Sequence, residues 1–305
     1  MTVAILGDGL LARSILDVFV KDEAPGGYAV MLGHHDFEIT SLDSIVAALK
    51  PHKPDVLINT VALHSLARCE DDPMLAQLIN AIGAGRVAGL VPTIYVSTDY
   101  VFNDGGPHDE TMPGQRPRSV YGQTKLAGEL ATLEHGGLVV RVAGLYGHHR
   151  SHKGPTFPET VTSGFTPLKL PTDQRFSPTY APDAAKRIAD LVTAWSEPAM
   201  LVTGSGAALV EGRVTAIPAL SIGDRGVEIT PVQGIYHAAN AGSATWYEFG
   251  THIAEVTRHK RVITGYAAHD RLRPTSSALR STRLPPLRHW MHALNDWAIE
   301  RERSL

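Results

Sequence analysis

The sequence predicts an α/β fold in which a doubly wound parallel sheet carries helices on both faces and joins a smaller mixed α/β lobe. Three observations lead to this prediction. Short apolar runs alternate with longer amphipathic stretches through the first half of the chain, a glycine-rich turn follows the first run, and a loop rich in glycine, proline and charge follows a later one. This alternation is typical of parallel sheets, which bind ligands at the carboxyl ends of their strands.

The predicted strands of the first half are short aliphatic runs. They cover residues 3–6, 29–32, 56–58, 93–97 and 138–142. A helix is predicted to begin after Ser119, with Leu126, Leu130 and Leu133 supplying its face toward the core. The loop at residues 99–117 lies between this helix and the strand before it, at the edge where a ligand is expected.

After residue 147 the alternation weakens and the proline and glycine content rises. Residues 148–171 are predicted to form a crossing segment, 183–195 and 246–257 helices, 234–239 another core strand, and 199–233 short strands. We therefore divide the chain into a dinucleotide-binding domain and a substrate-binding lobe. The first covers residues 1–147 with returns at about 168–198 and 234–250, and the second covers residues 148–167, 199–233 and 251–305.

Composition narrows the classes of function. The chain has 305 residues, and its net charge of −3 comes from 28 basic and 31 acidic residues without long runs of either sign. This balance argues against nucleic acid as a partner. No apolar stretch approaches the roughly 20 residues of a membrane span, and no signal peptide precedes the first strand, so we expect a cytoplasmic protein. Its one cysteine, Cys69, excludes an internal disulfide and a cysteine zinc site.

Tyr121 and Lys125 lie one helical turn apart and predict a proton donor for a carbonyl group. A free phenol has a pKa of about 10 and a free lysine about 10.4. A nearby ammonium favours the phenolate and is expected to lower the tyrosine pKa toward the working range. Thr98, at the end of a predicted strand, can hold the substrate oxygen. The three residues predict addition of a hydride to a ketone, or removal of one from an alcohol.

A hydride carrier is required, because no side chain supplies a hydride. The segment from Gly7 to Ala12 follows a predicted strand and opens an apolar-periodic helix. Gly7 allows a tight turn, Gly9 lets the backbone approach a pyrophosphate, and Ala12 allows close helix packing. Together with the tyrosine and lysine, this turn predicts the NAD(P)-binding Rossmann form of the α/β fold.

An ordered series of motifs makes the chain resemble the extended short-chain dehydrogenase/reductases, specifically their dTDP-4-dehydrorhamnose reductase branch. The resemblance runs from end to end. Its carriers are Ile58-Asn59 with Ala62, Cys69-Glu70 leading to Asn80, Ser97 to Phe102, Tyr121 through Lys125 to Glu129, Arg141 to Gly147, Asp173-Gln174 with Ser177 to Thr179, Gly234 to His237, Thr245 to Phe249, and Arg273-Pro274.

The resemblance implies reduction, with NAD(P)H, of the 4-keto group of a nucleotide-linked deoxysugar. It implies a catalytic trio of Thr98, Tyr121 and Lys125, with Tyr121 as the proton donor. The implied substrate-side residues are Asp99, Tyr100, Trp246 and Arg273. The implied cofactor-binding residues are Gly7, Gly9, Leu10, Leu11, His34, Asn59, Ala62, Leu63, Ser97, Tyr121 and Lys125.

The choice between NADP and NAD depends on the end of the second strand, where an acidic residue would hold a ribose hydroxyl and a basic one a phosphate. His34 and His35 stand beside Asp36 there, and Arg13 could also reach a phosphate. We lean slightly to NADPH. The partner expected is a small nucleotide sugar, with neither nucleic acid nor membrane, and a homodimer is left open.

Three departures from the branch affect the substrate. The glycine turn has a shorter form, Gly144 stands where the branch commonly has a tryptophan and is expected to enlarge or reshape the pocket, and residues 199–233 are longer than the branch requires. Three rival functions stay open: a nucleotide-sugar epimerase or dehydratase, a ketoreductase for a non-sugar ketone, and a non-catalytic regulatory subunit. Asp99-Tyr100 favours reduction over dehydration, for which an Asp-Glu pair is expected after Thr98.

Several of these residues also have structural interpretations. Thr98 could cap a turn, Trp246 could pack in the core, and Asn80 could either position Lys125 through water or be an ordinary paired polar group. His148, His149 and His152 cluster with Arg150 and Lys153. We interpret this cluster as a solvated loop first, as a diphosphate contact second and as a metal site last.

Overall fold

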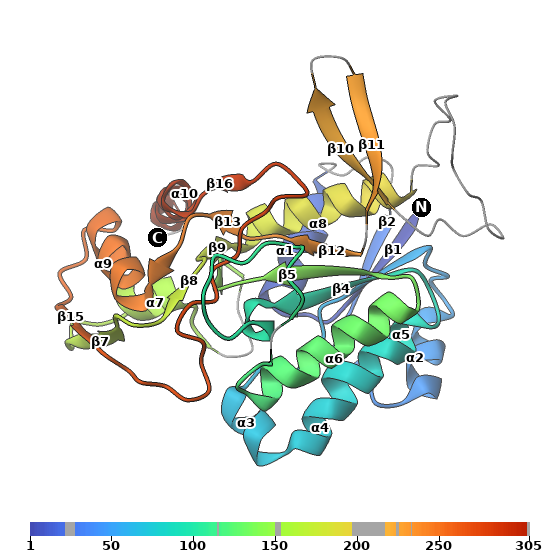
Figure 1. Ribbon diagram of the computed structural model, residues 1–305, viewed down its shortest axis with the longest axis horizontal. Coiled ribbons are helices and arrows are strands. Elements are labelled where there is room, and N and C mark those ends of the chain that lie inside the picture. Colours follow the sequence, from blue (N-terminus) through green and yellow to red (C-terminus); the bar gives the residue numbers. More distant parts are fainter. Residues whose placement is uncertain are drawn as a thin grey trace.

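A six-stranded parallel sheet forms the centre of the computed structural model (Figure 1). The structure describes residues 1–21, 28–114, 116–149, 154–196, 217–223, 226–232 and 234–303. The strands run in the order β12-β5-β4-β3-β1-β2, all paired in parallel. They are β1 (Thr2–Leu6), β2 (Tyr28–Leu32), β3 (Val56–Asn59), β4 (Thr93–Thr98), β5 (Leu138–Val142) and β12 (Ile235–His237). The predicted parallel sheet is confirmed, and its strand order reverses between β1 and β3, where α/β sheets bind ligands.

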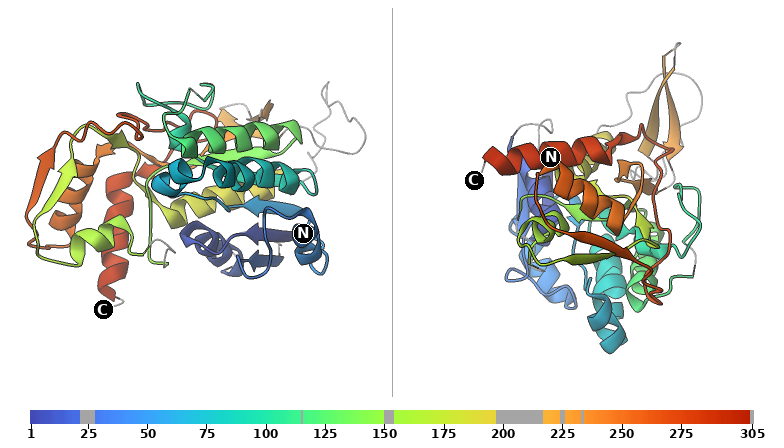
Figure 2. Two further views of the ribbon diagram at one scale, coloured as in Figure 1. Left: turned by 90° about the horizontal axis from the view of Figure 1, so that it is seen from below. Right: turned by 90° about the vertical axis from the view of Figure 1, so that its left-hand side faces the viewer.

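Helices cover both faces of the sheet because successive strand residues point to opposite sides. Val3 and Ile5 of β1 pack with helices α1 (Leu10–Val20) and α8 (Ala181–Ser196). Ala4 and Leu6 pack with α2 (Leu42–Leu49) and α5 (Ala84–Ala88) on the other face. The two views of Figure 2 show these layers and the second lobe at one end of them.

Helix α6 (Val120–Glu134) buries a polar face, and two of the three leucines predicted to face the core do so: Leu126 and Leu133 are partly buried and pack against buried apolar residues. Its buried residues include Thr124, Lys125 and Glu129, whereas Leu130 is 63% exposed. The prediction that Leu130 faces the core is therefore wrong. The buried polar groups are tolerated because partners on neighbouring strands hold them, as the site described below shows.

The second lobe has its own aromatic core. Phe176, Phe249 and Trp297 are buried there. Its elements are α7 (Phe157–Thr162), β7 (Leu168–Pro171), β8 (Arg175–Phe176), β14 (Ala244–Thr245), α9 (Trp246–Val256), β15 (Ile263–Tyr266) and α10 (Trp290–Arg303). The crossing segment predicted at residues 148–171 thus contains a helix and a strand, since β7 pairs with β15 far along the chain.

The segments predicted to return to the first domain divide between the two cores. Helix α8 and strand β12 pack with the large sheet, whereas β7 and α9 belong to the lobe. The predicted division of the chain into domains stays a prediction. Within residues 199–233, β10 (Ile217–Gly223) and β11 (Gly226–Val232) form an antiparallel hairpin, and residues 199–216, 224–225 and 233 lie outside the described part.

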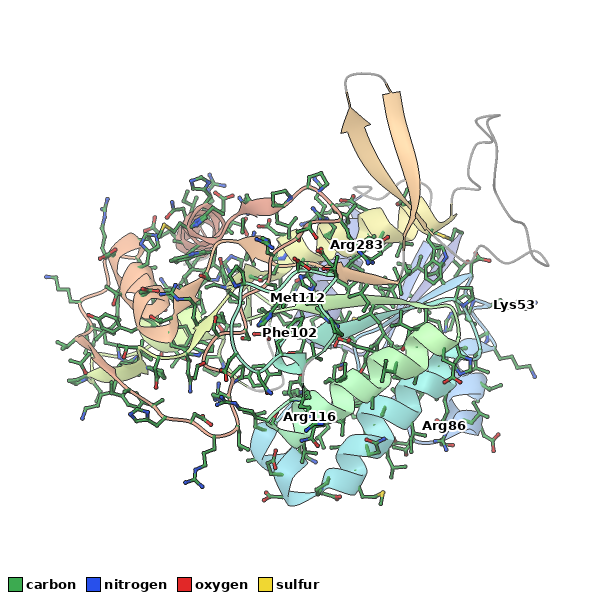
Figure 3. All side chains as sticks on the ribbon, viewed as in Figure 1. Lys53, Arg86, Phe102, Met112, Arg116 and Arg283 are labelled. Carbon is green, nitrogen blue, oxygen red and sulfur yellow. The ribbon has the colours of Figure 1, made fainter. Side chains whose placement is uncertain are left out.

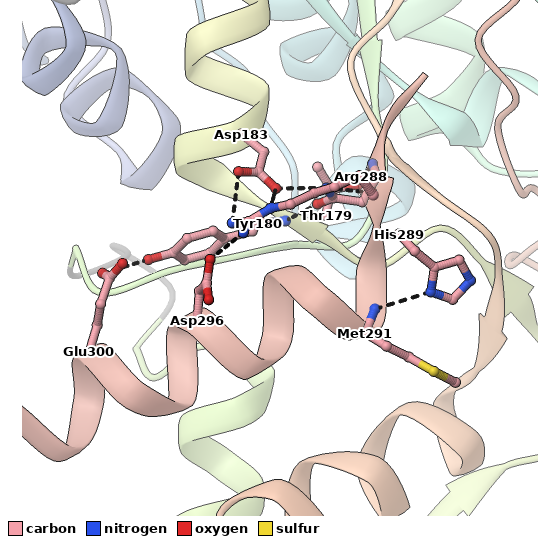
Figure 4. A network of polar contacts seen from close by, with 9 residues as sticks. Thr179, Tyr180, Asp183, Arg288, His289, Met291, Asp296 and Glu300 are labelled. Atoms are coloured by element: carbon pink, nitrogen blue, oxygen red, sulfur yellow. Dashed lines mark hydrogen bonds and ion pairs between the residues drawn. The ribbon is translucent and has the colours of Figure 1, made fainter. Parts of the chain in front are cut away.

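A polar network fastens the lobe to the large sheet (Figure 4). Arg288 of β16 (Leu287–His289) donates to Asp183 of α8 at 2.8 and 3.0 Å and also pairs with Asp296 of α10. The hydroxyl of Tyr180, in β9 (Thr179–Tyr180), donates to Glu300 at 2.8 Å. A planar guanidinium suits such paired carboxylates, so Arg288 holds α8 and α10 in one geometry.

None of the helices in the described part of the chain combines the length and the apolar character that a membrane span requires.

Candidate active site

Thr98 ends strand β4 and caps a single 3₁₀ turn, η2 (Asp99–Val101). Its hydroxyl oxygen accepts the backbone N–H of Tyr100 at 3.3 Å and donates its proton to the Asp99 carboxylate at 3.2 Å. Thr98 therefore caps this turn. Capping is compatible with a catalytic role, because it fixes the Thr98 hydroxyl at the carboxyl end of the sheet.

Tyr121 is brought to Thr98 by close packing of α6 on the loop after β4. The helix begins at its Ser119 cap, whose hydroxyl accepts the N–H of Gly122 at 3.1 Å. A Cβ at Gly122 would lie 2.3 Å from the carbonyl oxygen of Tyr100, so only glycine permits this approach. The hydroxyl of Thr98 is close enough to the Tyr121 phenol to act on its pKa, and the rings of Tyr121 and Tyr100 stand 5.7 Å apart.

Lys125 is 2% exposed and reaches inward from α6 to the sheet. Its Nζ donates to the carbonyl of Val96 at 2.7 Å and lies 3.8 Å from the centre of the Tyr95 ring. Burial lowers the pKa of Lys125 to about 7, although the charge of Glu129 works in the opposite direction. Lys125 can therefore gain or lose a proton near neutral pH.

Burial raises the pKa of Tyr121 above the ordinary value of a phenol. The nearby Asp99 and Tyr100 add to the rise, and the Thr98 hydroxyl opposes it. The predicted lowering is wrong, because desolvation of the buried phenolate outweighs the opposing effect of Thr98. Tyr121 consequently stays a protonated phenol, which is the state that a proton donor requires.

A buried ion pair lies behind Lys125. Glu129 accepts two hydrogen bonds from Arg141 of β5, at 2.9 and 2.7 Å, and both side chains are 1% exposed. Ser97 donates to the same carboxylate at 2.5 Å, so its predicted cofactor-binding hydroxyl is directed at Glu129. The Arg141 guanidinium also lies 4.9 Å from the Phe102 ring and donates to the carbonyl of Met112, two residues labelled in Figure 3.

The residues of the glycine turn fit a dinucleotide. Gly7 has a φ of +105°, and a Cβ there would lie 2.4 Å from the Thr60 hydroxyl, whereas a Cβ at Gly9 would meet no atom within 4 Å. The amino end of α1, which begins with Leu10 and Leu11, has no side-chain cap among the described residues. Unpaired N–H groups beside open space suit a pyrophosphate.

The loop after β3 completes this cradle. Asn59 ends β3, fully buried, and its side-chain amide nitrogen has no hydrogen-bond partner among the described residues. Asn80, in the π-helical turn η1 (Leu78–Gly83), holds the backbone of Leu63 through bonds of 2.8 and 3.0 Å. It also donates to Thr124 at 3.0 Å, so it is a paired polar group that positions the Leu63 loop. Ala62 precedes Leu63 in that loop.

The end of β2 lies against the glycine turn. His34 Nδ1 stands 3.4 Å from the carboxylate of Asp8, and the carboxylate of Asp36 accepts the N–H of Gly33 at 2.7 Å. Arg13 donates to the carbonyl of Asp8 at 2.9 Å. His34 is thus placed beside the turn as predicted for a cofactor-binding residue, with acidic and basic groups both present.

Asp99, Tyr100 and Arg273 meet beside Thr98 and Tyr121. Arg273 donates to the Tyr100 hydroxyl at 3.2 Å. The Asp99 side chain is turned inward, 3% exposed, with one oxygen facing Thr98 and the other accepting the hydroxyl of Ser277 at 2.5 Å. Ser277 was missed by the sequence analysis, because 178 residues separate it from Asp99.

Trp246 belongs to an aromatic stack in the lobe. Its ring stacks on Phe176 at 4.2 Å, and a Cβ at Gly144 would lie 2.3 Å from the same Phe176 ring. Phe176 therefore fills the space beside Gly144, and the effect of this glycine on a substrate pocket stays a prediction. The substrate contact of Trp246 stays a prediction.

The predicted histidine cluster is split between two partners. His148 pairs with Glu300 at 3.3 Å and stacks on Trp297, whereas His149 pairs with Asp17 of α1 at 2.7 Å. Residues 150–153 lie outside the described part of the chain. Within that part, no group of three or more His, Cys, Asp or Glu side chains could hold a metal ion.

Burial raises the pKa of Cys69 to about 11, and its thiol donates to the carbonyl of Leu63.

The parallel sheet, the dinucleotide cradle and the Thr98, Tyr121 and Lys125 trio define an NAD(P)-binding oxidoreductase of the extended short-chain dehydrogenase/reductase class. Within that class, the model of the RmlD substrate binding domain family matches residues 1–205. The chain belongs to this family.

Relatives match over nearly the whole chain. The chain is 31% identical to a dTDP-4-dehydrorhamnose reductase of Streptomyces griseus, over 94% of this chain and 90% of the relative. It is also 31% identical to a probable dTDP-4,6-dihydroxy-2-methyloxan-3-one 4-ketoreductase of Streptomyces antibioticus, over 94% and 91%. The crystal structure of dTDP-4-dehydrorhamnose reductase from Bacillus anthracis in complex with NADP shares the fold, with a TM-score of 0.78, 24% identity, and 98% and 99% of the two chains covered.

Proposed function

We propose that the protein is an NADPH-dependent reductase that converts the ketone of a dTDP-linked 4-keto-6-deoxysugar to an alcohol. The observation that carries the proposal is the meeting of Thr98, Tyr121 and Lys125 at the carboxyl end of β4, beside the cradle after β1 and β3. The names of the two Streptomyces relatives, both reductases of dTDP-linked sugars, support the substrate class.

NADPH would supply the hydride, and this chain would supply its binding site. Gly7, Gly9 and the amino end of α1, at Leu10 and Leu11, would hold the pyrophosphate. Asn59, Ala62 and Leu63 would border the dinucleotide at the end of β3, with His34 near the adenosine ribose. The unpaired amide nitrogen of Asn59 is available to the ligand, which supports this assignment.

The reacting ketone would be positioned and protonated by the trio. Thr98 would orient the carbonyl oxygen with its hydroxyl, and Tyr121 would donate the proton that converts the developing alkoxide to an alcohol. The raised pKa of Tyr121 keeps that proton in place until the oxygen becomes basic. Lys125, with a pKa of about 7, can return a proton to the site near neutral pH. Tyr100, Arg273 and Trp246 would lie on the substrate side, whereas the Asp99 carboxyl, turned inward and 3% exposed, would stand behind Thr98 instead of contacting the sugar.

The test is NADPH and NADH oxidation with a panel of dTDP- and UDP-linked 4-keto-6-deoxysugars. We expect turnover by the parent enzyme, preferring NADPH, and a loss of at least about 100-fold in kcat for Tyr121→Phe, which keeps the ring but removes the proton. Tyr266→Phe is the matched control, because Tyr266 is an exposed tyrosine of β15. It is expected to leave kcat unchanged.

Two outcomes would overturn the proposal. Binding of NADPH without turnover of any sugar would refute the nucleotide-sugar assignment and favour a different ketone or a regulatory role. Unchanged turnover in Tyr121→Phe would refute the role of the phenol. The homodimer, and the absence of nucleic-acid and membrane partners, stay predictions.

A further inference from the structure

A carboxyl group stands directly behind the catalytic threonine and has no step in the proposed mechanism. Asp99 is 3% exposed, and its two oxygens have different partners. Oδ1 accepts the hydroxyl proton of Thr98 at 3.2 Å, and Oδ2 accepts the hydroxyl proton of Ser277 at 2.5 Å. A carboxyl group so placed can control the direction of the Thr98 proton.

Ser277 is held in place by the backbone around it. The segment 273–279, here called the strap, crosses from the lobe to the loop after β4. The N–H of Ser277 donates to the carbonyl of Arg175 at 2.9 Å, and the carbonyl of Ala278 accepts the N–H of His108 at 2.8 Å. Thr275 donates its N–H to Asp104 at 2.9 Å. The strap therefore keeps the hydroxyl of Ser277 at Asp99 whatever the state of that carboxyl.

The hydrogen bonds around Thr98 depend on one proton. A threonine hydroxyl has a single O–H to donate and two lone pairs that accept. An ionised Asp99 only accepts, so it takes the Thr98 proton, as the structure shows. A protonated Asp99 can instead donate from Oδ1 to Thr98, since Oδ2 already accepts from Ser277. The proton of Thr98 is then released to point elsewhere.

We propose that Asp99 is a positioning residue for Thr98: its protonated carboxyl, held by Ser277, turns the Thr98 proton toward the ketone oxygen. The inference rests on the ketoreductase function proposed above. No bond is made or broken at Asp99. It selects which of two hydrogen-bond arrangements meets the substrate, and only one of them offers the ketone a donor from Thr98.

The charge state of Asp99 is sensitive to pH in the working range. Burial raises the pKa of Asp99 to about 6, against the lowering effects of the Ser277 and Thr98 hydrogen bonds and of the Arg273 charge. The titratable and charged groups around it are Arg273 of the strap, Tyr100 of η2 and Tyr121 of α6. The two tyrosines stay neutral in this range, because burial raises the pKa of each.

The experiment is the pH dependence of kcat, measured with NADPH and a sugar that the parent enzyme turns over. The parent is expected to lose kcat as the pH rises through the pKa of Asp99. In Asp99→Asn the amide nitrogen can donate to Thr98 at every pH, while the amide oxygen accepts from Ser277. The fall in kcat at the pKa of Asp99 is expected to disappear, so that only the fall at higher pH, from deprotonation of Lys125, remains, with KM unchanged.

Ser277→Ala tests the same inference without altering the carboxyl. The substitution removes a hydrogen-bond donor that favours the ionised form of Asp99. The pH at which kcat falls is therefore expected to rise by about one unit. Thr275→Val is the matched control, because Thr275 belongs to the same strap but its hydroxyl bonds Asp104. It is expected to leave that pH where it is in the parent.

The infrared carboxyl band of the protein without substrate gives a second readout. A band that titrates in the parent, is missing in Asp99→Asn and moves to higher pH in Ser277→Ala is expected. The inference is overturned if Asp99→Asn keeps the parental fall in kcat at the pKa of Asp99, if Ser277→Ala leaves the pH of that fall in place or lowers it, or if no such band titrates. A parent enzyme without turnover would instead refute the proposed function.

Discussion

Removing the charge of Glu129 is expected to destabilise the protein by about 3 kcal/mol, because it breaks a buried ion pair. Glu129 accepts one hydrogen bond from Ser97 and two from Arg141. The side chains of Glu129 and Arg141 are each 1% exposed. In Glu129→Gln the amide keeps one accepting oxygen but leaves the guanidinium without a counter-charge. The cost of an uncompensated buried charge, about 3 to 5 kcal/mol, sets the magnitude.

The neighbouring lysine makes the two halves of the pair unequal. Arg141→Met leaves the carboxylate of Glu129 one helical turn from the Lys125 ammonium, and the two charges interact. We therefore expect Arg141→Met to cost less than Glu129→Leu, which leaves Arg141 buried without a counter-charge and removes the charge that raises the pKa of Lys125. The double variant Glu129→Leu/Arg141→Met is expected to recover at least about 2 kcal/mol relative to the sum of the single changes.

The assay is urea unfolding of the parent, the two single variants, the double variant and Glu129→Gln at one pH. Glu255→Gln is the control, because Glu255 is 66% exposed and pairs with His252 within one helix. It is expected to change the free energy of unfolding by less than about 0.5 kcal/mol. A loss below about 1 kcal/mol in Glu129→Gln, or simple additivity in the double variant, would refute the reasoning.

Two further predictions concern glycines. Gly9→Ala is expected to weaken NADPH binding at least about 10-fold, because the added Cβ would occupy space meant for the pyrophosphate. Its thermal stability should change little, because that Cβ would meet no protein atom within 4 Å. Gly7→Ala should instead lose thermal stability, because its Cβ would clash with Thr60. Fluorescence titration and thermal unfolding measure the two effects, and unchanged affinity in Gly9→Ala would contradict the cradle. Gly144→Ala is expected to lose more than about 1 kcal/mol, since φ is +48° and Phe176 is in contact. Urea unfolding checks it, and a neutral result would show that Phe176 can move away.

The sheet could be predicted from the sequence because each strand is a local pattern. The predicted runs match β1 to β5 within one or two residues, and residues 234–239 contain β12. The helix after Ser119 was predicted for the same reason, and its cap is confirmed. The meeting of Thr98 with Tyr121 was expected from the spacing of Tyr121 and Lys125 and from the resemblance to the family.

The sequence predictions that failed share a cause: each depended on contacts with residues far away in the sequence. Periodicity pointed Leu130 inward, but Arg141 on β5 pairs with Glu129 and Val96 on β4 with Lys125, so the polar face of α6 is the buried one. Strand β7 was missed because it needs β15. The pKa of Tyr121 depends on burial, which residue spacing does not reveal.

The hydrogen bond between Ser277 and Asp99 affects the order in which the site can assemble during translation. The six strands of the large sheet are complete once residue 237 has been made, and the cradle and the trio are then all present. Ser277 comes 178 residues after its partner, so the nascent chain holds Asp99 without it until that many further residues have been made. Contacts so distant in sequence form late, because closing a long loop is entropically costly. The serine that holds Asp99 is thus encoded well after the parts that receive the dinucleotide.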